Sequence, residues 1–553
     1  MEQLRVAAEP LGLGAFGQLI RHFFRRFFDT ESLSPQAEPE ANVVQALGIL
    51  AVPSAFCVLV IRPLTLTGWD LVTFRTMFVS FSMVVMGFLT LLEWDALFPD
   101  RRDYQILIPL PLRLSTLFLA KTAALGIFLA LFLVDMNFFG VLFWPGIDAG
   151  PDPAAIMIAH SVAVLAGGLF AALAAAAVQG VLITILRGSL LRRVSVFLQT
   201  VLMAVMVMLL FLTPVMGLAA RSLVKTHSPF VYWLPAYWFV GLYERIRPVA
   251  HSADLLQLGD FAIWGLVIAG AVFILTYLPG YRSHARRMLE APAPTPSGPG
   301  PMHRWMGSIV DRLVARTPVE RAVFHFINQT ITRSAKHRLF LATYGGFGAA
   351  LAVMAFDSER DGLLRLPLTL SFVLISGLRA AFGFPSELRA NWAFQITETN
   401  AIGPYVAAMR KWVVACAVAP LFVLLAPMEF TCFPWPAALF HMAFGFALSL
   451  ALMEVLFFGF RKVPFTCARY PGRVNLVGLS AVYVFGFTMY SRTMAGFEEW
   501  LSGMPVTAAF FFAILAIGLT AARWGERRAA FEQALHYEDP VDPVVRTLDL
   551  SNG

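Results

Sequence analysis

Apolar runs long enough to cross a lipid bilayer recur along almost the whole chain. A transmembrane helix needs about 20 mostly apolar residues, and twelve stretches come close to that length or exceed it. Only 14% of the 553 residues are charged, against roughly 25% in soluble globular proteins. We therefore expect an all-α membrane protein with about twelve transmembrane helices, at residues 43–61, 74–92, 118–143, 156–186, 194–218, 261–277, 339–356, 366–382, 412–426, 437–460, 476–490 and 506–521.

Lysine and arginine residues predict the orientation of these spans. They are concentrated in the loops after the second, fourth, sixth and tenth runs and are missing from the short loops after the third and ninth. Basic loops stay on the cytoplasmic side, so both termini are expected in the cytoplasm. The long loop after the fifth run is expected outside although it contains Arg221, Lys225, Arg245 and Arg247, because long loops follow this rule poorly. The first run begins only near Val43 and has no small-residue cleavage pattern, so it is predicted to be a span rather than a signal peptide.

Two charged segments in the two halves of the chain resemble one another. FPDRRDYQILIPLPL (98–112) follows the second apolar run, and FPSELRANWAFQIT (384–397) follows the eighth. Each opens with Phe-Pro and leads to a lysine near the start of the next run, Lys121 or Lys411. The sequence therefore predicts two six-span repeats in the same orientation, related by an axis along the membrane normal.

The segment APAPTPSGPGP (291–301) is expected to join the repeats as a flexible linker, because it is rich in proline, glycine and serine. The predicted organisation has five parts, which are a cytoplasmic N-terminal segment (1–42), a first six-span unit (43–280), a cytoplasmic linker (281–338), a second six-span unit (339–522) and a cytoplasmic tail (523–553).

An amphipathic segment precedes each predicted repeat. Residues 13–28 place apolar side chains on one helical stripe and basic side chains opposite, which is typical of a helix lying along the inner membrane surface. Before the second repeat, Thr317 can cap a helix, Pro318 suits its first position, and Glu320 completes a capping box. A surface helix without a function would show the same pattern, but its recurrence before both repeats favours a functional role.

Signatures of catalysis are missing from the sequence. It contains no GxxxxGK[ST] nucleotide-binding loop, no HExxH, no GxSxG and no Cys/His cluster. Asp70 is the one acidic residue in the first predicted outer loop, and His160 and His441 lie near the outer ends of their predicted spans, where histidines are usually structural. The chain is not expected to be an enzyme, and a membrane-embedded transferase is the weakest of the alternatives.

Three polar residues lie inside predicted spans, where such side chains are costly and therefore informative. They are Asp135, Gln179 and Glu454. They can form buried hydrogen bonds between helices, or they can line a substrate path between the halves of the molecule.

This organisation resembles the permease subunits of type-2 ABC transporters, as a fused version with two six-span units. The residues that carry the resemblance are FPDRRDY (98–104) with LPLRLSTLFLAK (110–121), PFTCARYPGR (464–473) and AYWFVGLYE (236–244). It covers nearly the whole chain and implies an exporter in the plasma membrane, which is the inner membrane in bacteria. The resemblance also implies two copies of a separate ABC-type ATPase subunit, which would bind ATP and Mg²⁺ while this chain binds no cofactor. The other partners would be the lipid bilayer and an unidentified transported substrate, but no nucleic acid.

The resemblance implies roles for three kinds of element. Connecting helices lie along the membrane at about 13–28 and 317–332, and short helices cap the outside between the fifth and sixth spans. Coupling helices, which dock on the ATPase subunits, lie at 98–111 and 384–397. The coupling residues implied in this way are Phe98, Pro99, Asp100, Arg101, Arg102, Asp103, Tyr104, Phe384, Pro385, Glu387 and Arg389.

The two coupling segments differ in charge order and length, so the halves are expected to couple unequally. The main alternative is a twelve-span secondary transporter driven by protons, with Asp135 or Glu454 as the proton carrier. That alternative explains a parallel repeat, but it does not explain an amphipathic helix before each half or a Phe-Pro charged loop after the second span of each half.

Overall fold

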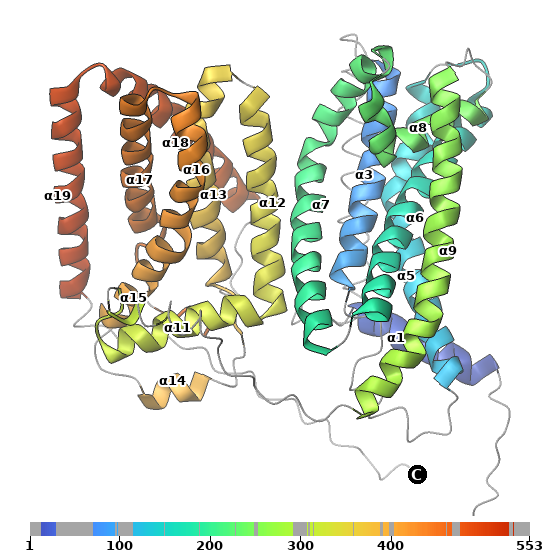
Figure 1. Ribbon diagram of the computed structural model, residues 1–553, viewed down its shortest axis with the longest axis horizontal. Helices are drawn as coiled ribbons and strands as arrows, with labels where there is room; N and C mark the ends of the chain where they lie inside the picture. Colours follow the sequence, from blue (N-terminus) through green and yellow to red (C-terminus); the bar gives the residue numbers. More distant parts are fainter. Residues whose placement is uncertain are drawn as a thin grey trace, which may run out of the picture. The chain divides into compact units, whose positions relative to one another are not determined.

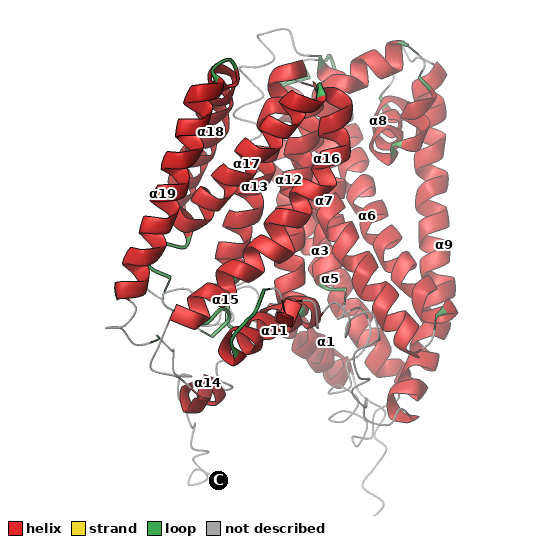
Figure 2. Ribbon diagram, turned by 60° about the vertical axis from the view of Figure 1, so that its left-hand side comes forward, coloured by secondary structure: helices red, strands yellow, loops and turns green. Residues whose placement is uncertain are grey.

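The structure is a computed structural model in which helices dominate (Figure 1). No strand occurs among the residues it describes, as Figure 2 shows. Those residues are 13–28, 70–94, 97, 114–148, 150–186, 188–226, 228–247, 253–290, 307, 310–312, 314–357, 359–386, 391–397, 403–460, 462–466, 476–529 and 535.

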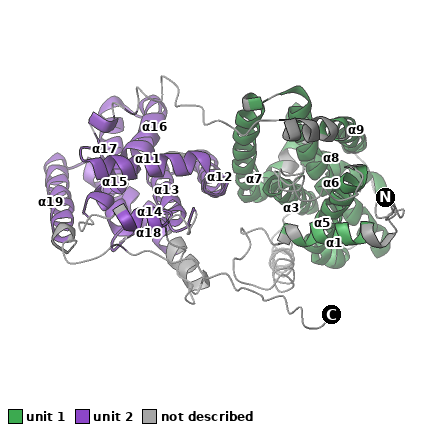
Figure 3. Ribbon diagram, turned by 90° about the horizontal axis from the view of Figure 1, so that it is seen from below, with its two compact units in different colours: residues 1–295 green, residues 296–553 purple. Residues whose placement is uncertain are grey.

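The chain divides into two compact units, Met1–Thr295 and Pro296–Gly553 (Figure 3). The division falls within the Pro-rich segment 291–301 of the sequence. Each unit is described below by itself.

Unit 1 is a bundle in which α3 is the central helix. It packs against α5, α6, α7 and the short helix α8, while α9 covers α6 and α8, and α1 lies against α5. Its elements are α1 (Leu13–Phe28), α3 (Leu71–Leu92), α5 (Leu114–Phe143), η1 (Trp144–Gly146), α6 (Pro153–Ile185), α7 (Gly188–Lys225), η2 (Pro229–Trp233), α8 (Pro235–Ile246) and α9 (Ala253–Glu290).

Unit 2 is built around α13, which packs against α12, α16, α17 and α18. The amphipathic helix α11 lies against α15, and α19 packs on α17 and α18. Its elements are α11 (Pro318–Arg333), α12 (Ala335–Asp357), α13 (Glu359–Ala381), α14 (Trp392–Thr397), α15 (Gly403–Val413), a π-helical stretch (Val414–Val418), α16 (Ala419–Cys432), α17 (Trp435–Leu456), α18 (Leu476–Ser502) and α19 (Pro505–Ala529).

The chain is a multi-pass membrane protein. Ten helices of the described residues are long and apolar enough to cross a bilayer, and each contains or overlaps one of the predicted spans. Many large apolar side chains on these helices face outward, among them Ile158, Trp264, Leu275 and Leu424. A soluble protein rarely exposes so much contiguous apolar surface, whereas lipid would cover it.

Two predicted spans are not among the ten. Residues 43–61 lie outside the described part of the chain. Residues 476–490 do form a helix, α18, but that helix continues to Ser502 through a segment with Glu498 and Glu499.

A π-helical stretch explains how the ninth predicted span stays helical in spite of its proline. Pro420 has no backbone N–H and cannot make the usual bond to the preceding turn. The wider turn at Val414–Val418 directly precedes it, and such turns re-route the backbone hydrogen bonds inside a helix. The candidate span is therefore continuous from Gly403 to Cys432.

Candidate functional site

The end of each unit that carries the amphipathic helix is called the basal end here, and the opposite end is called the distal end. In unit 2 the basal end is fixed by α11. The Thr317 side chain accepts a hydrogen bond from the Glu320 backbone N–H, and the Glu320 carboxylate accepts from the N–H groups of Arg316 and Thr317. The capping box predicted for this helix is therefore present.

An ion pair then ties α11 to the next element. The Lys411 Nζ of α15 lies 2.8 Å from Glu320 Oε1. Burial alone would raise the pKa of the Glu320 carboxyl, but the bond from Lys411 and the two backbone N–H bonds outweigh burial and lower it. The carboxylate is therefore held ionised and links the start of α11 to α15.

The segment that follows α13 is held against the body of unit 2 at several points. The Phe384 carbonyl lies 3.1 Å from His337 Nε2, and the Ser386 N–H donates to the Phe465 carbonyl. The Asn391 side chain donates to the Thr466 carbonyl at 2.6 Å. These contacts fix both sides of residues 387–390, which lie outside the described residues and include the predicted coupling residues Glu387 and Arg389.

Phe465 is the residue that organises this attachment. Its backbone has φ of 67°, a left-handed conformation that a bulky side chain adopts only when the surroundings enforce it. The ring is buried against Phe326, His337 and Phe382. Both of its backbone polar groups bond to the segment around Phe384: its N–H donates to the Phe382 carbonyl, and its carbonyl accepts from the Ser386 N–H.

The attached segment presents a short helix, α14, below α11 and α15 in Figure 1. Phe394 turns toward the body and contacts the Phe326 ring of α11, with a centroid distance of 4.9 Å. Trp392 and Ile396 are 63% and 75% exposed. Because residues four apart share a helix face, they form one apolar surface that no described residue covers.

In unit 1 the predicted coupling residues 98–104 lie outside the described residues, but the chain that leads to them is anchored. Three carbonyl groups, one in the last turn of α3 and two in the residues that follow it, each accept a hydrogen bond from a different helix. The donors are Gln199 of α7 to Leu91, Gln179 of α6 to Trp94, and Tyr277 of α9 to Leu97. Gln179, which the sequence placed among the candidate path residues, is part of this anchor.

A lysine touches the amphipathic helix in this unit too. Lys121, near the start of α5, is 7% exposed and lies over the Phe23 ring of α1, 5.6 Å from its centroid. A cation over an aromatic face is stabilised by the ring electrons. The Phe27 ring of α1 also contacts Phe128 of α5.

The other two candidate path residues lie in different surroundings. Glu454 of α17 accepts bonds of 2.8 Å from Arg410 of α15 and Arg523 of α19, so it joins three helices at the basal end of unit 2. Asp135 of α5 is half-buried in unit 1, and its Oδ2 atom has no hydrogen-bond partner among the described residues. Gln179 and Asp135 belong to unit 1 and Glu454 to unit 2, and their role in a path stays a prediction.

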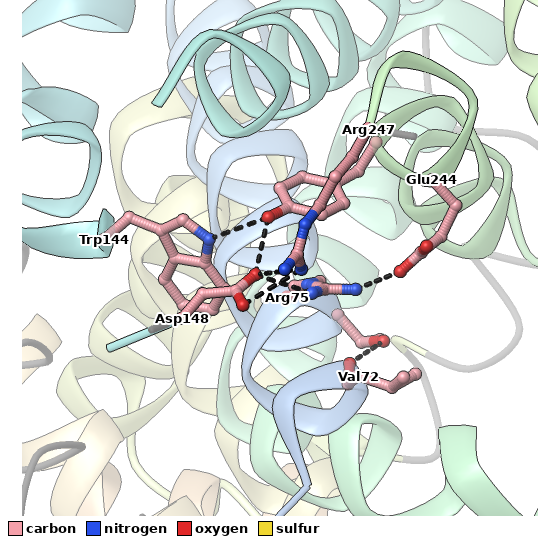
Figure 4. Close-up of polar contacts among 8 residues, drawn as sticks. Val72, Arg75, Trp144, Asp148, Glu244 and Arg247 are labelled. Carbon is pink, nitrogen blue, oxygen red and sulfur yellow. Dashed lines mark hydrogen bonds and ion pairs between the residues drawn. The ribbon is translucent and has the colours of Figure 1, made fainter. Parts of the chain in front are cut away.

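The distal end of unit 1 contains a charged network that sequence reasoning missed (Figure 4). Arg75, at the start of the second turn of α3, binds Glu244 of α8 and Asp148 of the η1 loop, and the bond to Asp148 is 2.6 Å long. Arg247 and the Tyr243 hydroxyl also donate to Asp148. Arg75 lies at the outer edge of an apolar run, and an isolated arginine in such a place was the available signal.

Electrostatics make this network a fixed anchor for α8. Burial alone would raise the pKa of the Asp148 carboxyl, but the Tyr243 hydrogen bond and the charges of Arg75 and Arg247 lower it below its ordinary value. Burial raises the pKa of Tyr243 to about 12. The network therefore holds two cations and two anions in balance, and α8 stays docked on α3.

Backbone packing reinforces the position of α8. A Cβ atom added to Gly241 would lie 2.5 Å from the Leu255 carbonyl oxygen and 2.6 Å from the Gly259 nitrogen of α9. Only glycine permits so close an approach of two helix backbones.

Comparison of the chain with protein-family models, with characterised proteins and with solved structures finds no match.

Proposed function

We propose that the chain is the permease subunit of an ATP-driven transporter, an exporter that works with a separate ATPase subunit. The proposal includes two parallel six-span repeats, cytoplasmic termini and location in the plasma membrane of a bacterium. In this orientation the basal ends face the cytoplasm, where an ATPase would bind ATP and Mg²⁺.

Repetition of the basal arrangement supports the two-repeat organisation. In each unit an amphipathic helix lies against the helix that follows the Phe-Pro loop, α1 against α5 and α11 against α15. In each unit a lysine of that second helix contacts the amphipathic helix, Lys121 with Phe23 and Lys411 with Glu320.

The observation that carries the proposal is α14. A helix of six residues with Trp392 and Ile396 exposed gains little from standing alone in water, and aromatic anchors of this kind are typical of buried contacts between proteins. It is attached to the body through Asn391, directly before its first residue, and through Phe394 within it, so that a force on α14 reaches the bundle. This is what a docking element for an ATPase requires.

A continuous set of contacts leads from α14 into the spans. Phe394 contacts α11, and the Glu320–Lys411 pair joins α11 to α15. The Arg410–Glu454 pair then joins α15 to α17. Closure of an ATPase dimer on α14 would move these elements together, and ATP binding would thereby shift the population between two states of the permease.

The test is ATP hydrolysis by the reconstituted complex. Replacement of both Trp392 and Ile396 by alanine is expected to abolish stimulated hydrolysis and binding of the ATPase subunit. Gln395→Ala, an exposed change on the same helix, serves as the matched control and should keep both. Equal stimulation in the double variant and the control would contradict the assignment of α14.

One observation favours the second candidate, a proton-coupled carrier. The Asp135 carboxyl in α5, whose Oδ2 has no hydrogen-bond partner among the described residues, is the kind of group that carries protons within a membrane. That candidate leaves the exposed face of α14 without a role.

A further inference from the structure

Three ionisable side chains meet at the distal end of unit 2. Glu429 lies in the last turn of α16, His441 in the second turn of α17, and Glu498 near the end of α18. They are 0%, 2% and 2% exposed. They are called the triad below.

The imidazole lies between the two carboxylates. His441 Nδ1 is 2.5 Å from Glu498 Oε1, and His441 Nε2 is 3.6 Å from Glu429 Oε1. Four buried atoms still lack a hydrogen-bond partner among the described residues, and they are both oxygens of Glu429, Oε2 of Glu498 and Nε2 of His441.

Among the described residues, two arginines of the neighbouring helices α13 and α19 bind other groups. Arg379 of α13 donates to the Leu456 carbonyl, and Arg523 of α19 binds Glu454, both at the basal end. Arg365 of α13 is half-buried and Arg492 of α18 is exposed, and the ion pairs that the described residues make with the triad glutamates involve neither of them. Among the described residues, His441 is thus the only cationic group that pairs with either glutamate.

A charge count then decides which protonation state can be buried. With both glutamates ionised and the imidazole neutral, the triad carries two negative charges, and an imidazolium reduces that to one. Burying an uncompensated charge costs several kcal/mol, so such groups neutralise instead. Two protons added to the state with both glutamates ionised and the imidazole neutral give a triad without net charge.

We propose that Glu429, His441 and Glu498 form a buried proton-binding site. One proton makes His441 an imidazolium paired with the Glu498 carboxylate. The other protonates Glu429, whose carboxyl can then be buried without a charge. Loss of the Glu429 proton to water leaves one net negative charge among α16, α17 and α18, which weakens their contact at the distal end.

The described residues offer no metal alternative. None of their groups of three or more His, Cys, Asp or Glu has an arrangement that could hold a metal ion. The distal end of unit 1 also differs, because Arg75 and Arg247 compensate its two carboxylates without a proton. The proposed proton site is built from residues of unit 2 and does not depend on the proposed function.

Infrared spectroscopy of the full chain in lipid nanodiscs tests the site, with protons themselves as the ligand. The wild type at neutral pH is expected to show the C=O band of a protonated carboxyl group, and Glu429→Gln should remove it. Glu499→Gln, an exposed neighbour of Glu498, is the matched control and should retain it. The same band in Glu429→Gln would overturn the proposal.

A stability measurement gives a second, independent readout. A proton held by folded Glu429 but released on unfolding makes the folded state less stable as pH rises, by about tenfold in the folded-to-unfolded ratio per pH unit. As pH rises, the wild type and Glu499→Gln should therefore lose stability more steeply than Glu429→Gln. Parallel pH profiles for all three would overturn the proposal, as would stabilisation of the wild type by Zn²⁺ that a chelator reverses.

The wild type alone decides the question if Glu429→Gln does not fold. The carboxyl band of the wild type should persist at pH values above about 4.3, where an ordinary glutamic acid loses its proton, and should vanish when the pH is raised further. Absence of the band at neutral pH would overturn the proposal.

Discussion

At the scale of single residues, the two units bury charge at their distal ends in different ways. In unit 1, Arg75 lies between Asp148 and Glu244, and every carboxylate of the network has a guanidinium partner. In unit 2, the one cationic partner that the described residues give to Glu429 and Glu498 is the His441 imidazole. The first arrangement is fixed over a wide pH range, whereas the second responds to protons.

Removal of the Arg75 charge is predicted to destabilise unit 1 strongly. Arg75→Gln leaves Glu244 and part of Asp148 without a partner in the protein interior, and breaking a buried pair in this way costs about 3–5 kcal/mol. Arg245→Gln removes the ion pair between Arg245 of α8 and Asp260 of α9, whose side chains are 45% and 54% exposed. Exposed pairs contribute about 1 kcal/mol or less. Thermal unfolding in detergent compares the two. Equal losses would show that the buried network is not a stabilising anchor.

Asp148 gives the network a predictable dependence on acid. Its pKa is lower in the folded state than its ordinary value, which is about 3.9. Its contribution to folding stability is therefore complete above the ordinary pKa and is lost as pH falls through the lower pKa of the folded state. The stability difference between wild type and Asp148→Asn should shrink as the pH falls below about 4, as followed by unfolding temperature. A difference that stays constant through this range would argue against the lowered pKa.

At the scale of elements, short-range patterns predicted the helices best. The stripe at residues 13–28 matches α1, and the capping residues Thr317 and Glu320 mark the start of α11, because both signals come from neighbouring residues. Hydropathy placed the limits of α18 poorly. The helix runs twelve residues past Tyr490, through a charged segment where Glu498 is buried by packing against His441 of another helix.

The Lys411–Glu320 pair is predicted to hold α11 against α15. Lys411→Ala removes a partner of the Glu320 carboxylate, so the first turn of α11 should open more often. Hydrogen–deuterium exchange of residues 318–325 should then speed up several-fold, because loss of the ion pair lowers the free energy of opening this turn by on the order of 1 kcal/mol. Lys336→Ala, an exposed change at the start of α12, should leave that exchange unchanged. Unaltered exchange in both variants would contradict a clamp at this position.

At the scale of the whole molecule, the sequence predicted a helical, multi-pass membrane protein, because the apolar runs are long and numerous. The distant contacts that build the candidate sites were not predictable in the same way. Arg75 and Glu244 are 169 positions apart, and Asn391 and Thr466 are 75 apart. Nothing in the local sequence around either partner identifies the other, so such pairs become visible only once the helices are packed.

The polar residues inside spans show the same limit. Gln179 and Glu454 were recognised as unusual, but residue type and position alone could not distinguish a substrate path from a contact that joins helices. Their partners, the Trp94 carbonyl in one case and Arg410 with Arg523 in the other, support the roles of anchor and clamp at the basal ends.

The central claim is that this chain transports by means of ATP hydrolysed on a separate subunit. The most direct measurement is to purify the full chain from its native membrane in mild detergent, determine the sequences of the chains that accompany it, and assay ATP hydrolysis. The account predicts an accompanying subunit with a GxxxxGK[ST] loop, hydrolysis of ATP by the complex, and loss of both when Trp392 and Ile396 are replaced by alanine. Purification of the chain without such a subunit, together with transport in vesicles driven by a proton gradient and abolished by Asp135→Asn, would contradict it.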